Sequence, residues 1–233
     1  MTVPGVVASP VTLTATDGVR IDGDYRRATS PRALILLFHQ AGSGKGEYAT
    51  IAPRLAAAGY SSLAIDQRAG GPLFGVNATA ARLGRPADYP EAQRDLEAAL
   101  AWGRAQGLPI ILWGSSYSAA LVFRVAAAHP QGVAAVLAFS PGEYLDDKQA
   151  VAHAAAAVRV PVFVTSADDA GEIAAARAIL AASPAALKRQ YLPRAGVHGS
   201  STLIPAKNAA GAAANWAAVL DFLHRVGGPT TPS

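Results

Sequence analysis

Short apolar or β-branched segments alternate with helix-like segments along most of this 233-residue chain. The strand candidates of this alternating part are residues 33–38, 60–65, 109–113, 133–139, 160–165 and 189–192. The helix candidates are residues 47–58, 90–106, 116–129, 171–182 and 209–226. Strand, helix and strand in repetition form βαβ units, and such units bury a parallel sheet between two layers of helices. This alternation therefore restricts the chain to an α/β architecture.

The N-terminal part departs from this alternation. Residues 11–16 and 19–27 are strand-like and flank Asp17-Gly18, a dipeptide typical of a hairpin turn. We therefore expect an α/β fold with a mostly parallel eight-stranded sheet, an N-terminal antiparallel hairpin, helices on both faces and no large lid domain. With 51% hydrophobic and 15% charged residues, the composition predicts a single domain over residues 1–226. Residues 227–233, rich in Gly, Pro and Thr, are expected to form a disordered tail.

Composition argues against several kinds of partner. The net charge is +4, but the Lys and Arg residues are scattered rather than clustered, which argues against a nucleic-acid partner. No apolar run reaches the ~18 residues of a membrane span. The chain has no Cys, and its five His residues lack metal-ligand spacing, so neither a metal nor another cofactor is expected. Residues 1–10 lack signal-peptide features and predict a cytoplasmic protein, although a mature exported form would look the same.

The segment after residues 109–113 is the strongest candidate for a reactive site. It reads Gly114-Ser115-Ser116-Tyr117-Ser118 and joins a strand pattern to a helix pattern. A nucleophile elbow at such a junction needs small residues two positions before and after the nucleophile. Ser116 has Gly114 and Ser118 at these positions, whereas Ser115 would have the bulky Trp113. Ser116 is therefore the predicted nucleophile, and the alternative is an ordinary serine helix cap.

A nucleophilic serine requires a base and an acid, which follow it in the chain order Ser, Asp or Glu, His. Residues 160–165 lead into Ser166-Ala167-Asp168-Asp169, and His198 lies in a Gly-flanked loop after the last strand candidate. The carboxyl ends of parallel strands meet at one edge of a sheet, so these groups are expected to lie near Ser116. The other histidines fit the base role less well: His39, His129, His153 and His224.

These motifs resemble the α/β-hydrolase superfamily, in particular its dienelactone-hydrolase-like and serine carboxylesterase branch. The resemblance runs from Val11 to Val226. Besides the elbow and the two downstream motifs, it includes Phe38-His39-Gln40-Ala41-Gly42-Ser43 and Asp66-Gln67-Arg68. Dienelactone hydrolases proper have a cysteine nucleophile, which this chain lacks.

The resemblance implies roles for individual residues. It favours Asp169 as the acid, with Asp168 as the second choice and Glu143 or Asp146 as remoter ones. It implies that the backbone N–H groups of Tyr117 and Ala41 form the oxyanion hole, with Gln40 as a neighbouring option. The chain departs from the family pattern in two places. Ser118 replaces Gly in the elbow, and His39-Gln40 replaces the commoner His-Gly.

We therefore expect a serine hydrolase that cleaves esters of small or medium acyl groups through an acyl-enzyme intermediate. Its partner would be a small-molecule ester. A peptidase or an acyltransferase with the same triad, or a non-catalytic binding protein of the same fold, are the alternatives. Residues 42–46 suggest a phosphate loop, but His39 and Gly46 stand where that motif requires Gly and Ser or Thr. Asp66 and Arg68 are interpreted as a salt-bridged brace rather than as substrate ligands.

Overall fold

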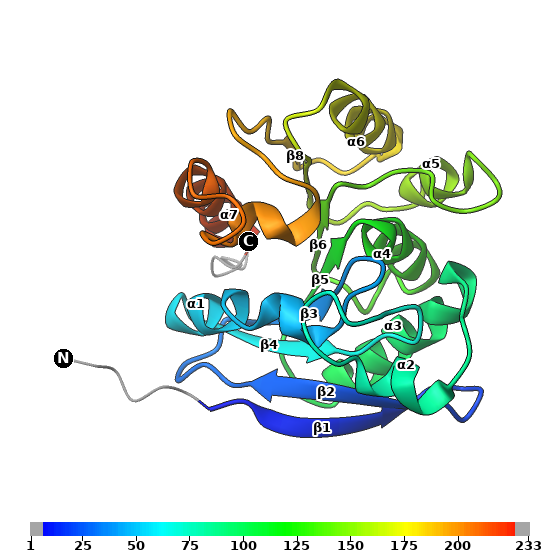
Figure 1. Cartoon of the computed structure of the whole chain (residues 1–233). Coiled ribbons are helices and arrows are strands. Elements are labelled where there is room, and N and C mark those ends of the chain that lie inside the picture. The colour runs from blue at the N-terminus through cyan, green and yellow to red at the C-terminus, as the bar shows by residue number, and fades with distance from the viewer. Residues whose placement is uncertain (1–6, 227–233) are drawn as a thin grey trace.

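The computed structural model describes residues 7–226 and confirms the predicted α/β fold (Figure 1). Its eight strands form one sheet in the order β1-β2-β4-β3-β5-β6-β7-β8. The strands are β1 (Ser9–Thr14), β2 (Arg20–Arg26), β3 (Ala33–Phe38), β4 (Tyr60–Ile65), β5 (Ile110–Ser115), β6 (Ala135–Phe139), β7 (Val162–Thr165) and β8 (Lys188–Gln190). The predicted tail, residues 227–233, lies outside the described residues.

The sheet is parallel from β4 to β8 and antiparallel at its N-terminal edge. β1 pairs with β2, and β2 pairs with β4, both in antiparallel register. The turn between β1 and β2 contains Gly18, whose φ of 81° explains the glycine of the predicted Asp17-Gly18 turn. The predicted hairpin and parallel sheet are therefore both present.

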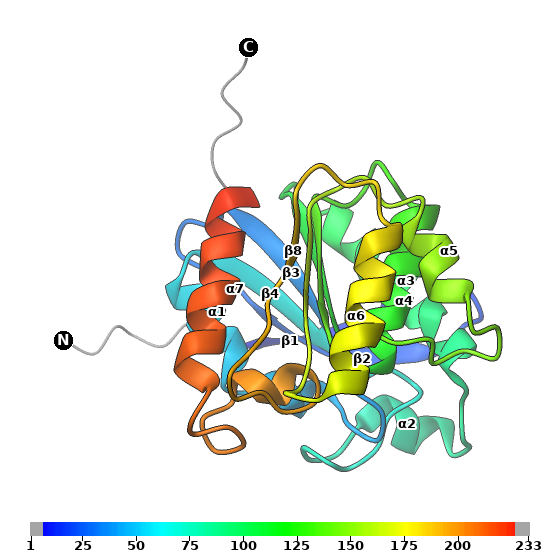
Figure 2. The same ribbon diagram turned by 90° about the horizontal axis from the view of Figure 1, so that it is seen from above.

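Helices cover both faces of the sheet (Figures 1 and 2). They are α1 (Ile51–Ala57), α2 (Ala78–Leu83), α3 (Tyr89–Arg104), α4 (Tyr117–Ala128), α5 (Ala150–Ala155), α6 (Ala170–Ala182) and α7 (Ala212–Val226), with 3-10 turns η1 (Lys45–Tyr48) and η2 (Gly199–Leu203). α1 and α7 pack on one face, and α3, α4, α5 and α6 cover the other.

The sequence of β3 shows why both faces are covered. Leu34, Leu36 and Phe38 belong to the apolar core beneath α3 and α4, whereas Ile35 and Leu37 belong to the core beneath α1 and α7. Successive side chains of a strand point to opposite faces, so a continuous apolar run needs helices on both sides. β3 and β5 are neighbouring parallel strands, so the loops that follow them lie at the same edge of the sheet.

Several boundaries differ from the expectation. The helix predicted over residues 47–58 is divided into η1 and α1, and Gly59, with φ 86°, ends it. The connection over residues 69–89 contains α2, whose N-cap Asn77 accepts a hydrogen bond from the Ala80 N–H. None of the helices within residues 7–226 is long and apolar enough to cross a membrane.

Candidate active site

Ser116 lies between β5 and α4 with φ 60° and ψ −123°. A residue other than glycine seldom adopts a positive φ, so the backbone is strained here. Gly114 is required by the sharp turn, because a Cβ at this position would lie 2.4 Å from the Ser118 carbonyl oxygen. The Ser116 N–H donates to the Phe139 carbonyl at 2.8 Å and anchors the turn to β6. This is the geometry that the elbow pattern predicts.

His198 is paired with Glu172, a residue that the sequence analysis did not select. His198 Nδ1 lies 2.7 Å from Glu172 Oε1, and Glu172 Oε2 accepts the Ala167 N–H at 2.9 Å. Burial would raise the pKa of Glu172, but hydrogen bonds, above all that from His198, lower it to about 2. The same hydrogen bond raises the pKa of His198, and burial opposes this rise. Glu172 is therefore ionised at neutral pH and fixes one ring nitrogen of His198.

The structure contradicts the expectation that Asp169 partners His198. Asp169 is the N-cap of α6, and its Oδ1 accepts the Glu172 N–H at 2.9 Å. Asp168 is exposed, and its N–H donates to the Gly196 carbonyl. The remoter candidate Glu143 instead accepts the N–H groups of Val151 and Ala152. Asp146, the other remote candidate, is exposed and lies in a surface hollow beside Tyr144.

A sequence signal for Glu172 was available. Asp169-Ala170-Gly171-Glu172 has the spacing of a helix cap with an acidic residue at the third helical position. In the first turn of a helix that follows a parallel strand, such a residue can reach back over the sheet edge. The family spacing, counted from Ser166, reaches Asp169 and ends before this helical turn.

The loop that carries His198 is held against the elbow. The Ser200 N–H donates to Ser115 Oγ at 2.8 Å, and the Gly199 N–H donates to Ser140 Oγ at 2.9 Å. Gly199 is required here, since it has φ 65° and a Cβ would lie 2.5 Å from Ser115 Oγ. Within residues 7–226 no hydrogen bond joins Ser116 Oγ to His198; such bonds are often long before substrate binds.

The backbone N–H groups of Ala41 and Tyr117 have no hydrogen-bond acceptor in the described part of the chain. Both were expected as oxyanion donors. Gln40 was the neighbouring option, but its N–H already donates to Glu47 Oε2 at 2.9 Å. Gln40 is therefore removed from the candidate donors.

His39 fixes the loop that contains Ala41. Its Nε2 accepts the Gln67 N–H at 2.9 Å, so Nδ1 carries the proton and donates to the Gln40 carbonyl at 2.8 Å. Burial lowers the pKa of His39 to about 4. The ring is therefore neutral, and its nitrogens join this loop to the segment after β4. Gln40 is not among the non-glycine residues with positive φ within residues 7–226, so its backbone does not require the glycine of the family pattern.

Ser118 also differs from the family pattern, and its hydroxyl has two partners. It donates to the His39 carbonyl and accepts from Gln67 Nε2 at 2.7 Å. Arg68, next in the chain, pairs with Asp95 at 2.8 Å and with Asp17. Asp66, through Lys45, and Arg68 are therefore both salt-bridged, as expected for a brace.

Comparisons with known proteins agree with this geometry. The family described as "Serine aminopeptidase, S33", a family of α/β-hydrolases, matches residues 29–169, more than half of the chain. The chain belongs to this S33 family. No curated protein matches it by sequence.

Solved structures show the same fold. A dienelactone hydrolase from Anabaena variabilis has 19% identity and a TM-score of 0.73 over 94% of this chain and 97% of its own. A thermostable carboxyl esterase from Bacillus coagulans has 12% identity and a TM-score of 0.72 over 95% and 99%. A cold-adapted esterase from an Arctic intertidal metagenomic library has 20% identity and a TM-score of 0.72 over 97% and 96%.

In this S33-family hydrolase, two surface hollows meet at Tyr89, whose ring stacks on that of Tyr117 at 4.3 Å. One, of about 510 Å³, includes Ala41. The other, of about 370 Å³, includes Tyr144. Burial raises the pKa of Tyr144, and the Ser116 hydroxyl is near enough to oppose this rise. Both hollows are therefore adjacent to the candidate site.

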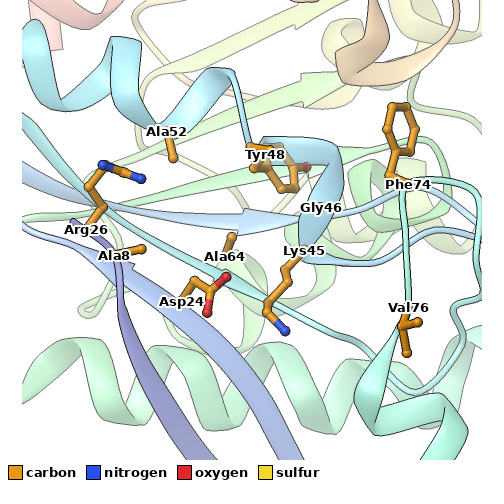
Figure 3. A pocket seen from close by; sticks show the side chains of 11 residues that line it. Ala8, Asp24, Arg26, Lys45, Gly46, Tyr48, Ala52, Ala64, Phe74 and Val76 are labelled. Atoms are coloured by element: carbon orange, nitrogen blue, oxygen red, sulfur yellow. The ribbon is translucent and has the colours of Figure 1, made fainter. Parts of the chain in front are cut away.

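A further pocket of the S33-family fold, of about 190 Å³, lies apart from Ser116 (Figure 3). Asp24 of β2 and Lys45 of η1 point into it, and Lys45 Nζ also pairs with Asp66 Oδ2 at 3.0 Å. Neither Ser116, His198 nor Glu172 lines this pocket. It is therefore distinct from the candidate active site.

Proposed function

We propose that the protein is a serine hydrolase that cleaves carboxylic esters of small or medium acyl groups through a Ser116-His198-Glu172 triad. The observation that carries the proposal is the 2.7 Å contact between His198 and Glu172, made at the sheet edge where Ser116 has φ 60°. In a triad the acid orients the imidazole, and the other ring nitrogen takes the serine proton.

The reaction has two halves. His198 Nε2 accepts the proton of Ser116 Oγ as the oxygen attacks the ester carbonyl, and Glu172 stabilises the resulting imidazolium. The N–H groups of Ala41 and Tyr117 donate to the oxyanion. His198 then protonates the leaving alcohol. Water, deprotonated by His198, attacks the acyl carbonyl. The bond to Ser116 Oγ then breaks, His198 returns the proton to this oxygen, and the carboxylic acid is released.

The hollows on either side of Tyr89 support substrates of limited size. They open at the surface beside Ala41 and Tyr144. The connection from β6 to β7 contains only α5 as a regular element, so within residues 7–226 this connection forms no large lid over the site. Small and medium acyl groups fit such hollows better than long chains, which need a deep apolar tunnel.

The decisive experiment combines labelling with turnover. A fluorophosphonate is expected to modify Ser116, identified by mass spectrometry, and p-nitrophenyl acetate and butyrate are expected to be hydrolysed faster than the decanoate. Ser116→Ala should abolish both activities. Ser183→Ala, a buried serine whose Oγ donates to the Val158 carbonyl at 2.7 Å, is the matched control and should retain both. Labelling of another residue, or unchanged turnover in Ser116→Ala, would refute the proposal.

The family match favours a peptidase as the second candidate. Both functions would use the same triad, so labelling of Ser116 does not separate them. Turnover of aminoacyl p-nitroanilides, compared with turnover of the esters, does. Faster turnover of the anilides than of the esters would replace the esterase proposal by an aminopeptidase.

A further inference from the structure

Glu47 is a buried carboxylate beneath the candidate active site. It belongs to η1 and is 1% exposed. Its Oε2 accepts the Gln40 N–H at 2.9 Å, and its Oε1 accepts the Ser115 hydroxyl at 2.7 Å. Ser115 Oγ in turn accepts the Ser200 N–H at 2.8 Å. We call this chain of three hydrogen bonds the Glu47 bridge.

The Glu47 bridge ends beside each part of the proposed machinery. Gln40 directly precedes the oxyanion donor Ala41, Ser115 directly precedes the nucleophile, and Ser200 lies two residues after His198. The segments around Gln40, Ser115 and Ser200 are thus linked through one buried carboxylate. Two weaker or peripheral links also join them, from Ser118 Oγ to the His39 carbonyl and from Gln40 Nε2 to Ser201 Oγ, but among residues 7–226 only Glu47 hydrogen-bonds to the residues directly beside both Ala41 and Ser116.

A carboxylate at this position is costly for the fold. Burial raises the pKa of Glu47 to about 7, although hydrogen bonds from Gln40 and Ser115 oppose the rise. An apolar residue would avoid this desolvation, so packing alone does not account for a glutamate. Retaining an acid here is consistent with a functional role.

We propose that Glu47 is a positioning residue, which sets the distance of the oxyanion donor and of the His198 loop from Ser116. This inference rests on the proposed hydrolase function. Glu47 touches neither substrate nor the reacting atoms. It acts through Gln40 and Ser115, and its loss would lower the rate of the chemical step more than the binding of substrate.

The test compares Glu47→Ala with the conservative Glu47→Gln. Glu47→Ala removes both acceptors, so we expect kcat for p-nitrophenyl acetate to fall at least 100-fold while KM changes less than threefold. In Glu47→Gln the amide oxygen can accept the Gln40 N–H and the amide N–H can donate to Ser115 Oγ, so kcat should recover to within tenfold of wild type. A folded Glu47→Ala with kcat within threefold of wild type would overturn the inference, as would equal losses in the two variants.

Ser115→Ala provides a second route if Glu47→Ala does not fold. It removes the bonds to Glu47 and Ser200 with a smaller change of volume, and kcat should fall at least tenfold. Ser183→Ala makes the same substitution at a buried serine near the opposite end of β7 and should leave kcat unchanged. Full activity in Ser115→Ala would contradict the inference.

Amide hydrogen exchange separates this inference from the proposed function. Exchange at Gln40 should accelerate at least tenfold in Glu47→Ala but not in Glu47→Gln, where the amide oxygen still accepts this N–H. Exchange at Ser200 should accelerate at least tenfold in Ser115→Ala, and neither amide should change in Ser183→Ala. If the wild-type protein hydrolyses no ester, the proposed function fails. Faster exchange in these variants would still show that the Glu47 bridge holds the segments of Gln40 and Ser200 in place. Unchanged exchange at both amides would overturn the inference in an active enzyme.

Discussion

His198 Nδ1 lies 2.7 Å from Glu172 Oε1, and this contact joins the loop after β8 to the first turn of α6. The neighbouring Asp169 accepts the N–H of the same glutamate. The two acids are three residues apart and have different tasks. Glu172 contacts the imidazole, and Asp169 caps the helix that carries Glu172.

Substitution separates these tasks. Glu172→Gln should lower kcat at least 100-fold with the fold intact, because the amide cannot stabilise the imidazolium. Asp169→Asn should lower kcat less than tenfold, since an asparagine also caps a helix. Steady-state kinetics on p-nitrophenyl acetate measures both. A larger loss of kcat in Asp169→Asn than in Glu172→Gln would assign the role of the acid to Asp169.

The pH profile follows from the charge of Glu172. Its hydrogen bond raises the pKa of His198 above the ordinary 6.5. Only the neutral imidazole accepts the serine proton, so kcat/KM should fall as pH drops through a value above 6.5. Glu172→Gln removes the charge, and the residual activity should show this limb at lower pH. A limb at the same pH in both proteins would argue against the pair.

Ser118 should stabilise the fold through its hydroxyl. Ser118→Ala leaves the buried His39 carbonyl without this donor and deprives Gln67 Nε2 of one acceptor. We expect a loss of about 1–3 kcal/mol in the free energy of unfolding, measured by urea denaturation. Ser183→Ala, whose hydroxyl likewise donates to one carbonyl and accepts one N–H, should cost a similar amount, and no measurable loss in Ser118→Ala would contradict this role.

Glu47 should make stability depend on pH. Its folded pKa of about 7 lies above the ordinary 4.5, so the folded state holds the proton more tightly than the unfolded state. Its contribution is complete below pH 4.5 and is lost as pH rises through 7, by about 3 kcal/mol in total. The unfolding free energy of Glu47→Gln relative to wild type should therefore increase from pH 5 to 8. A constant difference would indicate an unshifted group.

The positive φ of Ser116 predicts that glycine at this position gives a more stable fold than alanine. Glycine tolerates φ 60° without the cost of about 1–3 kcal/mol that other residues bear in such regions. Ser116→Gly should therefore melt at a higher temperature than Ser116→Ala, with both inactive. Differential scanning calorimetry measures this difference, and a lower melting temperature for the glycine variant would contradict the strain.

Much of this arrangement could be predicted along the chain. The apolar runs fixed the strands, Gly114 and Ser118 identified the elbow, and chain order selected His198. The family resemblance implied Ala41 and Tyr117 as oxyanion donors, and their N–H groups lack acceptors among residues 7–226. The strands and the elbow depend on residues close together in sequence, whereas His198 and the donors depend on chain order and family pattern.

The sequence by itself determined the α/β alternation and the turn after β5 that carries Ser116, because periodicity and turn sterics act over a few residues. Only the tertiary structure decided that Glu172, and not Asp169, meets His198. The direction of α6 relative to β8 sets which of two nearby carboxylates reaches the ring, and that direction is fixed by packing across the whole sheet. The same holds for Glu47, whose partners are 7, 68 and, through Ser115, 153 residues away in the chain.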